Sequence, residues 1–480
     1  MKKSYISILL AALVTITSCT LDADLKSAIT TPSAWSTPND AKAGMYGVLS
    51  QFRAAFMSGY MYWGEYRTGL WGPSPHGVTQ IVRDQTYENK LPASHEYADW
   101  TALYTTINDA NLVLKHVPSI SFNDESDKRM ILGNALYVRA FTYYWIARIW
   151  GDAPLLLNGY ESEEDMYPSR APKSDIFAQV ASDLSEAEGL LKDLKIKPNY
   201  ANINAVYTLE TDLYLWLYKV EKDDSALAKA RTACDAVLGK GKLLPSFKDV
   251  FNVENKNNDE EIFVISMVKD EKEGGAQADW LCPLQDVSAS LCENPVKVGS
   301  HQQWSFITKD YQDLLTADAS DVRGQATFDS KYDEAKKTTH MWMNKLTGSW
   351  IDKTRVFNSD YIFYRYADVL LFDAEISCYE NRLAEAAASV SKIAERATGK
   401  ADKYAASLGA EALLDAILTE RTKEFCCEGR LWWDYIRMGV VFDKVPALKG
   451  KQNNKNILLW PVSNNALNGN QNIRQTEIEY

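Results

Sequence analysis

The chain has few of the residues from which metal and catalytic sites are usually built. It contains only five histidines and seven cysteines in 480 residues, and the histidines are scattered without the spacing typical of metal ligands. It also lacks the nucleophile-elbow serine motif, the phosphate-binding glycine loop and the His-Glu-x-x-His motif of metalloproteases. We therefore expect no catalytic residues, no metal site and no cofactor.

Positive charge is also scarce. The 52 lysines and arginines are outnumbered by 64 aspartates and glutamates, which gives a net charge of −12. An acidic protein is repelled by nucleic acid and by anionic lipid, so neither is an expected partner. Neutral sugars and cationic peptides remain compatible ligands. Beyond the N-terminal segment, no apolar run approaches the ~20 residues that a helix needs to cross a bilayer.

The cysteines are too sparse for a disulfide scaffold. Cys282 and Cys292 flank a loop-like stretch and could either pair in an oxidising compartment or remain free. Cys426 and Cys427 are adjacent, where a bridge would be strained, so we interpret them as small core residues.

The N-terminus has the pattern of a bacterial export signal. Lys2 and Lys3 precede a mostly apolar run, Ile6–Ile16, that is too short to span a membrane. Residues 16–19, Ile-Thr-Ser-Cys, resemble a lipobox, in which the cysteine is acylated and becomes the mature N-terminus. We therefore predict lipidation at Cys19. The alternative is an ordinary secretory signal with a chance cysteine.

Hydrophobic periodicity predicts a mainly α fold. The expected helices cover residues 103–114, 129–150, 173–193, 202–221, 225–238, 364–381, 384–397, 410–427 and 431–442. Paired helices at a spacing of roughly 34 residues are typical of tetratricopeptide repeats. Between 240 and 360 turn-forming residues become frequent, and only 261–268 has the pattern of a strand. We expect a scaffold of tetratricopeptide-like helix pairs with a loop-rich second part containing little β structure.

Five segments resemble blocks of the SusD/RagB family. WTALYTTINDANLVL (100–114) and ALYVRAFTYYWIARIWGDAPLLL (135–157) are similar to two consecutive family helices and the turn that follows. YRYADVLLFDAEI (364–376) and TERTKEFCCEGRLWWDYIRMG (419–439) resemble its Arg-Tyr-Ala-Asp and Glu-Gly-x-Arg-x-Trp-Asp motifs. ILLWPV (457–462) resembles its closing segment, and we expect only this part of the Asn-rich tail to be ordered. The blocks occur in family order across nearly the whole chain.

This resemblance implies a cell-surface lipoprotein of Bacteroidetes that captures a nutrient outside the outer membrane. Family members pass the nutrient to a SusC-like TonB-dependent transporter, over which they sit as a lid. The implied partners are that transporter, a glycan ligand and the outer membrane, which the protein reaches through its lipid anchor. Asp22 and Asp24, close behind Cys19, resemble the acidic signal that sends such lipoproteins to the cell surface.

The expected organisation has four parts. They are a lipoprotein signal peptide (1–18), a tether (19–40), an N-terminal helical region with tetratricopeptide-like repeats (41–240) and a C-terminal region (241–480) whose loop-rich insertion covers 241–360.

The motif at 419–439 invites a functional interpretation, but its helical context favours a structural one. Arg421 with Glu424, and Arg430 with Asp434, are expected to form ion pairs that tie helix ends together. Several tryptophans on apolar helix faces are likewise expected in the core: Trp100, Trp145, Trp150, Trp216, Trp432, Trp433 and Trp460.

The chain holds 14 tryptophans and 26 tyrosines, more than the helical blocks account for. A second group lies in loop-like segments, including YMYWGEYRTGLWG at 60–72, where flat rings can either stack on sugar or brace the loops. The expected ligand contacts are Trp71, Trp280, Trp304 and Trp350, followed by Trp63, Tyr66 and Arg67. Polar partners could be Glu65, Asp279, Gln302, Gln303 and Asn344.

Four functions compete on this reading. The leading one is a carbohydrate-binding lipoprotein that feeds an importer, and the alternative is capture of peptides or glycopeptides. A hydrolase and a structural or adhesive surface protein are less favoured. The excess of aromatic over charged loop residues favours sugar, because a peptide site more often needs charges to fix backbone ends and side chains.

Overall fold

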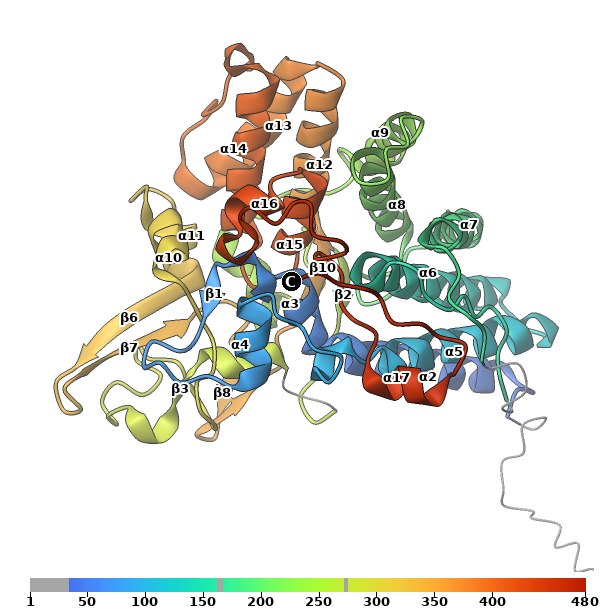
Figure 1. Cartoon of the computed structure of the whole chain (residues 1–480), viewed down its shortest axis with the longest axis horizontal. Helices are drawn as coiled ribbons and strands as arrows, with labels where there is room; N and C mark the ends of the chain where they lie inside the picture. Colours follow the sequence, from blue (N-terminus) through green and yellow to red (C-terminus); the bar gives the residue numbers. More distant parts are fainter. Residues whose placement is uncertain (1–33, 162–166, 272–274) are drawn as a thin grey trace, which may run out of the picture.

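The computed structural model describes residues 34–161, 167–271 and 275–480. The signal peptide, Cys19 and most of the tether expected at 19–40 lie outside these residues. Within the described ranges, no helix is both long enough and apolar enough to cross a membrane. The fold is mainly α, as predicted (Figure 1).

Consecutive helices of the first half pack against one another and form the right-hand side of Figure 1. They are α2 (Pro38–Phe56), α5 (Thr101–His116), α6 (Glu125–Trp150), α7 (Lys173–Leu191), α8 (Ile203–Lys219) and α9 (Ala226–Val237). The tether prediction ran three residues too far, because a capping box between Thr37 and Asp40 starts α2 at Pro38. The expected tetratricopeptide-like pairing is confirmed, since α6 packs on α7 and α8 on α9.

The second half supplies another group of packed helices. They are α12 (Tyr366–Tyr379), α13 (Leu383–Thr398), α14 (Gly409–Glu424), α15 (Leu431–Arg437), α16 (Val441–Lys444) and α17 (Asn464–Gly469). The first three lie together at the top of Figure 1. Short helices α3 (Gly59–Gly64), α4 (Ile81–Tyr87), α10 (Lys309–Thr316) and α11 (Arg323–Thr327) connect the groups.

The strands are short and form only two-stranded sheets in the described residues. They are β1 (Trp71–Gly72), β2 (Glu261–Ile265), β3 (Cys282–Pro283), β4 (Val298–Gly299), β5 (Phe306–Ile307), β6 (Phe328–Asp333), β7 (Thr338–Met343), β8 (Ser349–Ile351), β9 (Thr354–Val356) and β10 (Tyr361–Arg365). The pairs are β1 with β5, β2 with β10, β3 with β4, β6 with β7, and β8 with β9. The described part of the loop-rich insertion therefore holds two hairpins, β6–β7 and β8–β9, that the sequence pattern did not reveal. The strand predicted at 261–268 is present over Glu261–Ile265.

One hydrophobic cluster extends from Ala41 to Ile473 and joins both halves. The C-terminal tail is part of it over more than the predicted closing segment. Trp460 donates its main-chain N–H to Ile149 O at 2.8 Å, and the Trp150 indole donates to Pro461 O at 3.0 Å. Ile473 also belongs to the cluster. The prediction that only ILLWPV would be ordered was therefore wrong.

A buried ion network lies beneath the 419–439 motif, and its pairs differ from those expected. Arg421 pairs with Asp434 at 2.8 Å, while Arg430 pairs with Asp368. Glu424 instead receives a 2.6 Å hydrogen bond from Arg365. The structural role was predicted correctly, but the partners come from β10, α12 and α15, which sequence spacing alone could not bring together.

Candidate functional site

Five of the seven predicted ligand contacts lie inside the protein. Trp71, Trp280, Trp63, Tyr66 and Arg67 are each at most 3% exposed. Residues 60–72 therefore do not form an exposed loop, because α3 and the turn after it are buried. Of the two roles expected for these side chains, burial supports bracing.

Hydrogen bonds between side chains tie these aromatics together. The Trp280 indole donates to Tyr66 Oη at 3.0 Å, and the Trp71 indole donates to Glu65 Oε1 at the same distance. Glu65 also accepts the main-chain N–H groups of Cys427 and Gly429. This layer therefore connects the loop-rich region to the 419–439 motif and gives the surface above it a rigid base.

Arg67 anchors the C-terminal segment. Its guanidinium donates to Leu458 O at 2.7 Å and Ile457 O at 2.9 Å, and it lies 4.1 Å from the Trp432 ring centroid. All of these partners belong to the protein itself, so Arg67 stabilises the fold in this conformation.

Trp304 is different because its ring is only partly buried. Its main-chain N–H donates to Asp279 O at 3.0 Å, which fixes the backbone beneath it. The Arg83 guanidinium lies 5.9 Å from the ring centroid and is paired with the Asp279 carboxylate at 2.5 Å. Burial raises the pKa of Asp279, and the pairing with Arg83 opposes that rise.

The surroundings of Trp304 offer polar groups. His301 is exposed and Gln302 half-buried on the preceding residues. Arg83 Nε has no hydrogen-bond partner among the described residues. A ligand seated against Trp304 can therefore meet an aromatic ring and hydrogen-bonding groups.

Trp350 repeats this arrangement on β8. The ring is partly buried against a small cluster that contains Trp342, and the Arg355 guanidinium lies 5.4 Å from its centroid. Arg355 is in turn paired with Glu293 and donates to Val298 O at 3.0 Å. Each of the two exposed tryptophans thus has an arginine on one side that a carboxylate holds in place.

We call the surface formed by Arg83, His301, Gln302 and Trp304 the Trp304 face. Trp304, Gln302 and Asp279 were predicted from the sequence, whereas Arg83 and His301 were missed. Arg83 lies far from Trp304 along the chain, and no motif marks it. Of the other polar candidates, Glu65 and Gln303 are buried, and Asn344 accepts the Trp342 indole N–H at 2.8 Å.

The described residues also show what kinds of site they could form. In the described ranges, no cluster of three or more His, Cys, Asp or Glu side chains could hold a metal ion. Cys282 and Cys292 are free thiols here, and burial raises the pKa of Cys282 to about 12. A partly exposed ring with nearby donors is instead typical of sites that stack on the apolar face of a sugar.

Two family models match the chain. The model described as SusD family matches residues 302–480. The model described as starch-binding associating with outer membrane matches residues 76–215.

Curated relatives match over greater lengths. A SusD-like protein of Formosa agariphila is 24% identical over 489 residues, which covers 95% of this chain and 94% of that protein. A second SusD-like protein of that organism is 24% identical over 395 residues, covering 73% and 71% of the two chains.

Solved structures share the fold. A SusD superfamily protein from Bacteroides fragilis and another from Bacteroides vulgatus each superpose with a TM-score of 0.79 at 24% identity. In both cases the match covers 92% of this chain and 99% of the other.

Proposed function

Because the chain belongs to the SusD/RagB family, we propose that it is a lipid-anchored, cell-surface protein that binds a nutrient glycan. We further propose that it delivers the glycan to a SusC-like TonB-dependent transporter in the outer membrane. The matched description, starch-binding associating with outer membrane, supports the ligand class and the location. The lipobox-like segment ending at Cys19 supports the anchor.

The observation that carries the binding role is the partly exposed Trp304 ring above its buried aromatic layer. A sugar ring has an apolar C–H face that fits an aromatic ring, and its hydroxyls need polar partners. Arg83 is held by Asp279 at 2.5 Å, so its orientation is set before a ligand arrives. The proposed activity is binding without turnover, with the cargo released unchanged to the transporter.

The test compares variants of the two exposed tryptophans with a matched control. A panel of neutral and acidic oligosaccharides, together with tri- and tetrapeptides, is first screened against the wild type. Calorimetric titration of the best ligand then follows for Trp304→Ala, Trp350→Ala and Trp35→Ala. Trp35 is a suitable control because it is also partly exposed but stacks on His116, with ring centroids 5.2 Å apart.

We expect Trp304→Ala to weaken glycan binding by about 2 kcal/mol, or roughly thirtyfold. Its melting temperature should stay close to that of the wild type, and Trp35→Ala should retain full affinity. Preferential binding of peptides would support the alternative of peptide or glycopeptide capture. Full affinity in both Trp304→Ala and Trp350→Ala would show that the site lies elsewhere, and shortened glycan products would contradict a purely binding role.

A further inference from the structure

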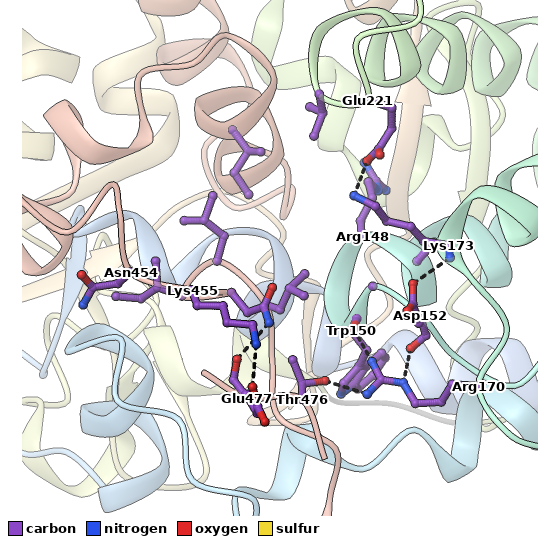
Figure 2. Close-up of a pocket in the computed structure, with 18 of the residues that line it drawn as sticks. Arg148, Trp150, Asp152, Arg170, Lys173, Glu221, Asn454, Lys455, Thr476 and Glu477 are labelled. Carbon is purple, nitrogen blue, oxygen red and sulfur yellow. Dashed lines mark hydrogen bonds and ion pairs between the residues drawn. The ribbon is translucent and has the colours of Figure 1, made fainter. Parts of the chain in front are cut away.

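A cavity of about 700 Å³ lies away from the Trp304 face, between the helical scaffold and the C-terminal tail (Figure 2). Its volume is within the range of small-molecule sites, roughly 300–1,000 Å³. One wall comes from the end of α6, the start of α7 and the end of α8. The opposite wall comes from residues 452–459 and 474–477 of the tail.

The tail wall is firmly attached, so the cavity is formed before any ligand binds. Lys455 pairs with Glu477 at 2.5 Å and joins the two tail segments that line the cavity. The Arg170 guanidinium donates to Thr476 Oγ1 at 2.9 Å and to Trp150 O at 2.9 Å, which joins the two walls (Figure 2). A preformed site avoids the entropic cost of ordering a loop on binding.

The cavity has an apolar part of its own. Trp216, Val220, Ile436, Phe442, Leu458 and Leu459 contribute to its lining. The Trp216 residue is only 4% exposed, and its indole N–H has no hydrogen-bond acceptor among the described residues. The indole N–H is itself shielded from solvent, so Trp216 contributes ring surface to the cavity wall.

The charge of the lining is the reverse of the charge of the whole protein. Five cationic side chains (Arg148, Arg170, Lys173, Lys455 and Arg474) face three anionic ones (Asp152, Glu221 and Glu477). Two of the anionic groups are already paired, Glu221 with Lys173 at 2.8 Å and Glu477 with Lys455. The excess is therefore positive in a protein whose net charge is −12.

Two guanidinium groups carry that excess. Within the described residues, neither Arg170 nor Arg474 forms an ion pair with a carboxylate. Arg170 uses four N–H bonds on neutral acceptors: Asp152 O, Arg474 O, Thr476 Oγ1 and Trp150 O. A guanidinium has five N–H groups, so one remains available, and burial lowers the pKa of Arg170 because its charge is partly desolvated.

We propose that this cavity is a second ligand site, separate from the Trp304 face, and that it takes a short oligosaccharide bearing a carboxylate. Arg170 and Arg474 would receive the carboxylate. The apolar side chains would contact the C–H face of the ring. The choice of a sugar as the carboxylate bearer rests on the proposed function, whereas the existence of an anion-selective site does not.

The test uses uronate trisaccharides and their neutral counterparts. Trigalacturonate, trimannuronate and triglucuronate are each titrated beside the hexose trisaccharide of the same linkage, by calorimetry and by tryptophan fluorescence. We expect at least one acidic trisaccharide to bind about tenfold or more tightly than its neutral counterpart. Raising the salt from about 50 mM to about 500 mM should weaken the acidic ligand only, because screening acts on the charge.

Three variants locate the site. Arg474→Gln removes an exposed cation of the cavity, and Trp216→Phe reduces the aromatic surface of the cavity wall. Lys449→Gln is the matched control, since Lys449 is an exposed cation of the same tail outside the cavity. We expect the first two to reduce uronate affinity at least fivefold and the control to leave it within twofold. Arg170→Gln serves as a further test provided that its melting temperature shows an intact tail.

The outcomes separate this proposal from the proposed function. Trp304→Ala should weaken binding at the Trp304 face by roughly thirtyfold and leave uronate binding at the cavity unchanged. Loss of uronate binding in Trp304→Ala, or unchanged uronate affinity in both Arg474→Gln and Trp216→Phe, would overturn the second site. Equal binding of acidic and neutral sugars, or binding of free carboxylates such as citrate in preference to every uronate, would overturn the acidic-saccharide assignment.

Discussion

His95 shows how one buried side chain can limit stability in acid. Its Nδ1 accepts the main-chain N–H of Tyr97 at 3.1 Å, which leaves Nε2 as the protonated nitrogen facing Val82 O at 2.8 Å. A second proton, on Nδ1, would place the imidazole N–H against the main-chain N–H of Tyr97. Burial lowers the pKa of His95 from 6.5 to about 4; the hydrogen bond to Val82 O opposes the shift and the nearby charge of Arg67 adds to it.

We expect this group to destabilise the protein as the pH falls. Between pH 6.5 and about 4 the unfolded chain binds a proton at His95 that the folded chain does not. The free energy of unfolding is therefore unaffected by His95 above pH 6.5 and falls as the pH drops toward 4. At pH 5 the loss is on the order of 2 kcal/mol. Urea unfolding at pH 7.5 and 5 should show a smaller pH effect for His95→Gln than for the wild type.

The control for this experiment is His76→Gln, because His76 is exposed. It should retain the full pH effect. An unchanged pH dependence in His95→Gln would assign the acid sensitivity to other groups.

At the level of single residues, the sequence supplied the aromatic candidates for the site but did not predict which of them are exposed. Trp71 and Trp304 both lie in loop-like sequence, yet Trp71 is buried and Trp304 is not. The difference comes from long-range partners: Trp71 meets Glu65, which is held by Cys427 and Gly429. No local pattern encodes a contact across more than 360 residues.

The docking of α3 depends on the absence of one side chain. A Cβ atom at Gly64 would lie 1.8 Å from Gly429 O, a main-chain atom that cannot rotate away. The same turn is held by Gly429, whose φ of +69° lies in the left-handed region. The two glycines therefore allow α3 to approach the 425–430 turn closely enough for Glu65 to bond to it.

We predict that Gly64→Ala separates these elements and lowers the free energy of unfolding by about 3 kcal/mol or more, or prevents folding. Gly47→Ala is the matched control, because Gly47 lies within α2 and its added Cβ would contact nothing within 4 Å. The control should be neutral or gain roughly 0.5–1 kcal/mol from helix propensity. Equal stability of the two variants in urea unfolding would contradict the close approach.

Elements with a strong local signal were predicted well. The helices at 129–150 and 173–193 correspond to α6 (Glu125–Trp150) and α7 (Lys173–Leu191), because apolar periodicity and the stop at Gly151 are both local. The hairpin β6–β7 was missed because its strands are partly exposed and lack a strict alternation. The paired arginine and carboxylate behind each exposed tryptophan arise only when separate segments meet.

The whole molecule behaves as one unit in its packing, although 41–240 and 241–480 were expected as separate regions. The hydrophobic cluster from Ala41 to Ile473 runs through both. Arg365, fully buried, donates to Glu260, Glu424 and Glu428 within the second region. Removing a partner from such a buried set leaves uncompensated charge, which typically costs about 3–5 kcal/mol.

We predict that Arg365→Lys lowers the free energy of unfolding of both regions together. Lysine cannot bond three carboxylates in the geometry of the guanidinium fork. Hydrogen exchange at the amides of α6 should therefore accelerate in this variant, and circular dichroism and fluorescence should report one common unfolding midpoint. Arg382→Lys, at a side chain 46% exposed, should change neither measurement by more than about 0.5 kcal/mol. Two separate transitions, or unaltered exchange in α6, would show that the regions unfold independently.

The bond from Glu65 to the turn at Cys427 and Gly429 also governs when this chain can fold during its synthesis. The ribosome makes α3 long before that turn, so the aromatic layer around Trp71 has no partner for most of translation. Contacts so distant along the chain form slowly, because a long loop must close before any of them stabilises the structure. In the exported lipoprotein that we propose, a core completed only by its last segments would delay premature folding and keep the polypeptide competent for translocation.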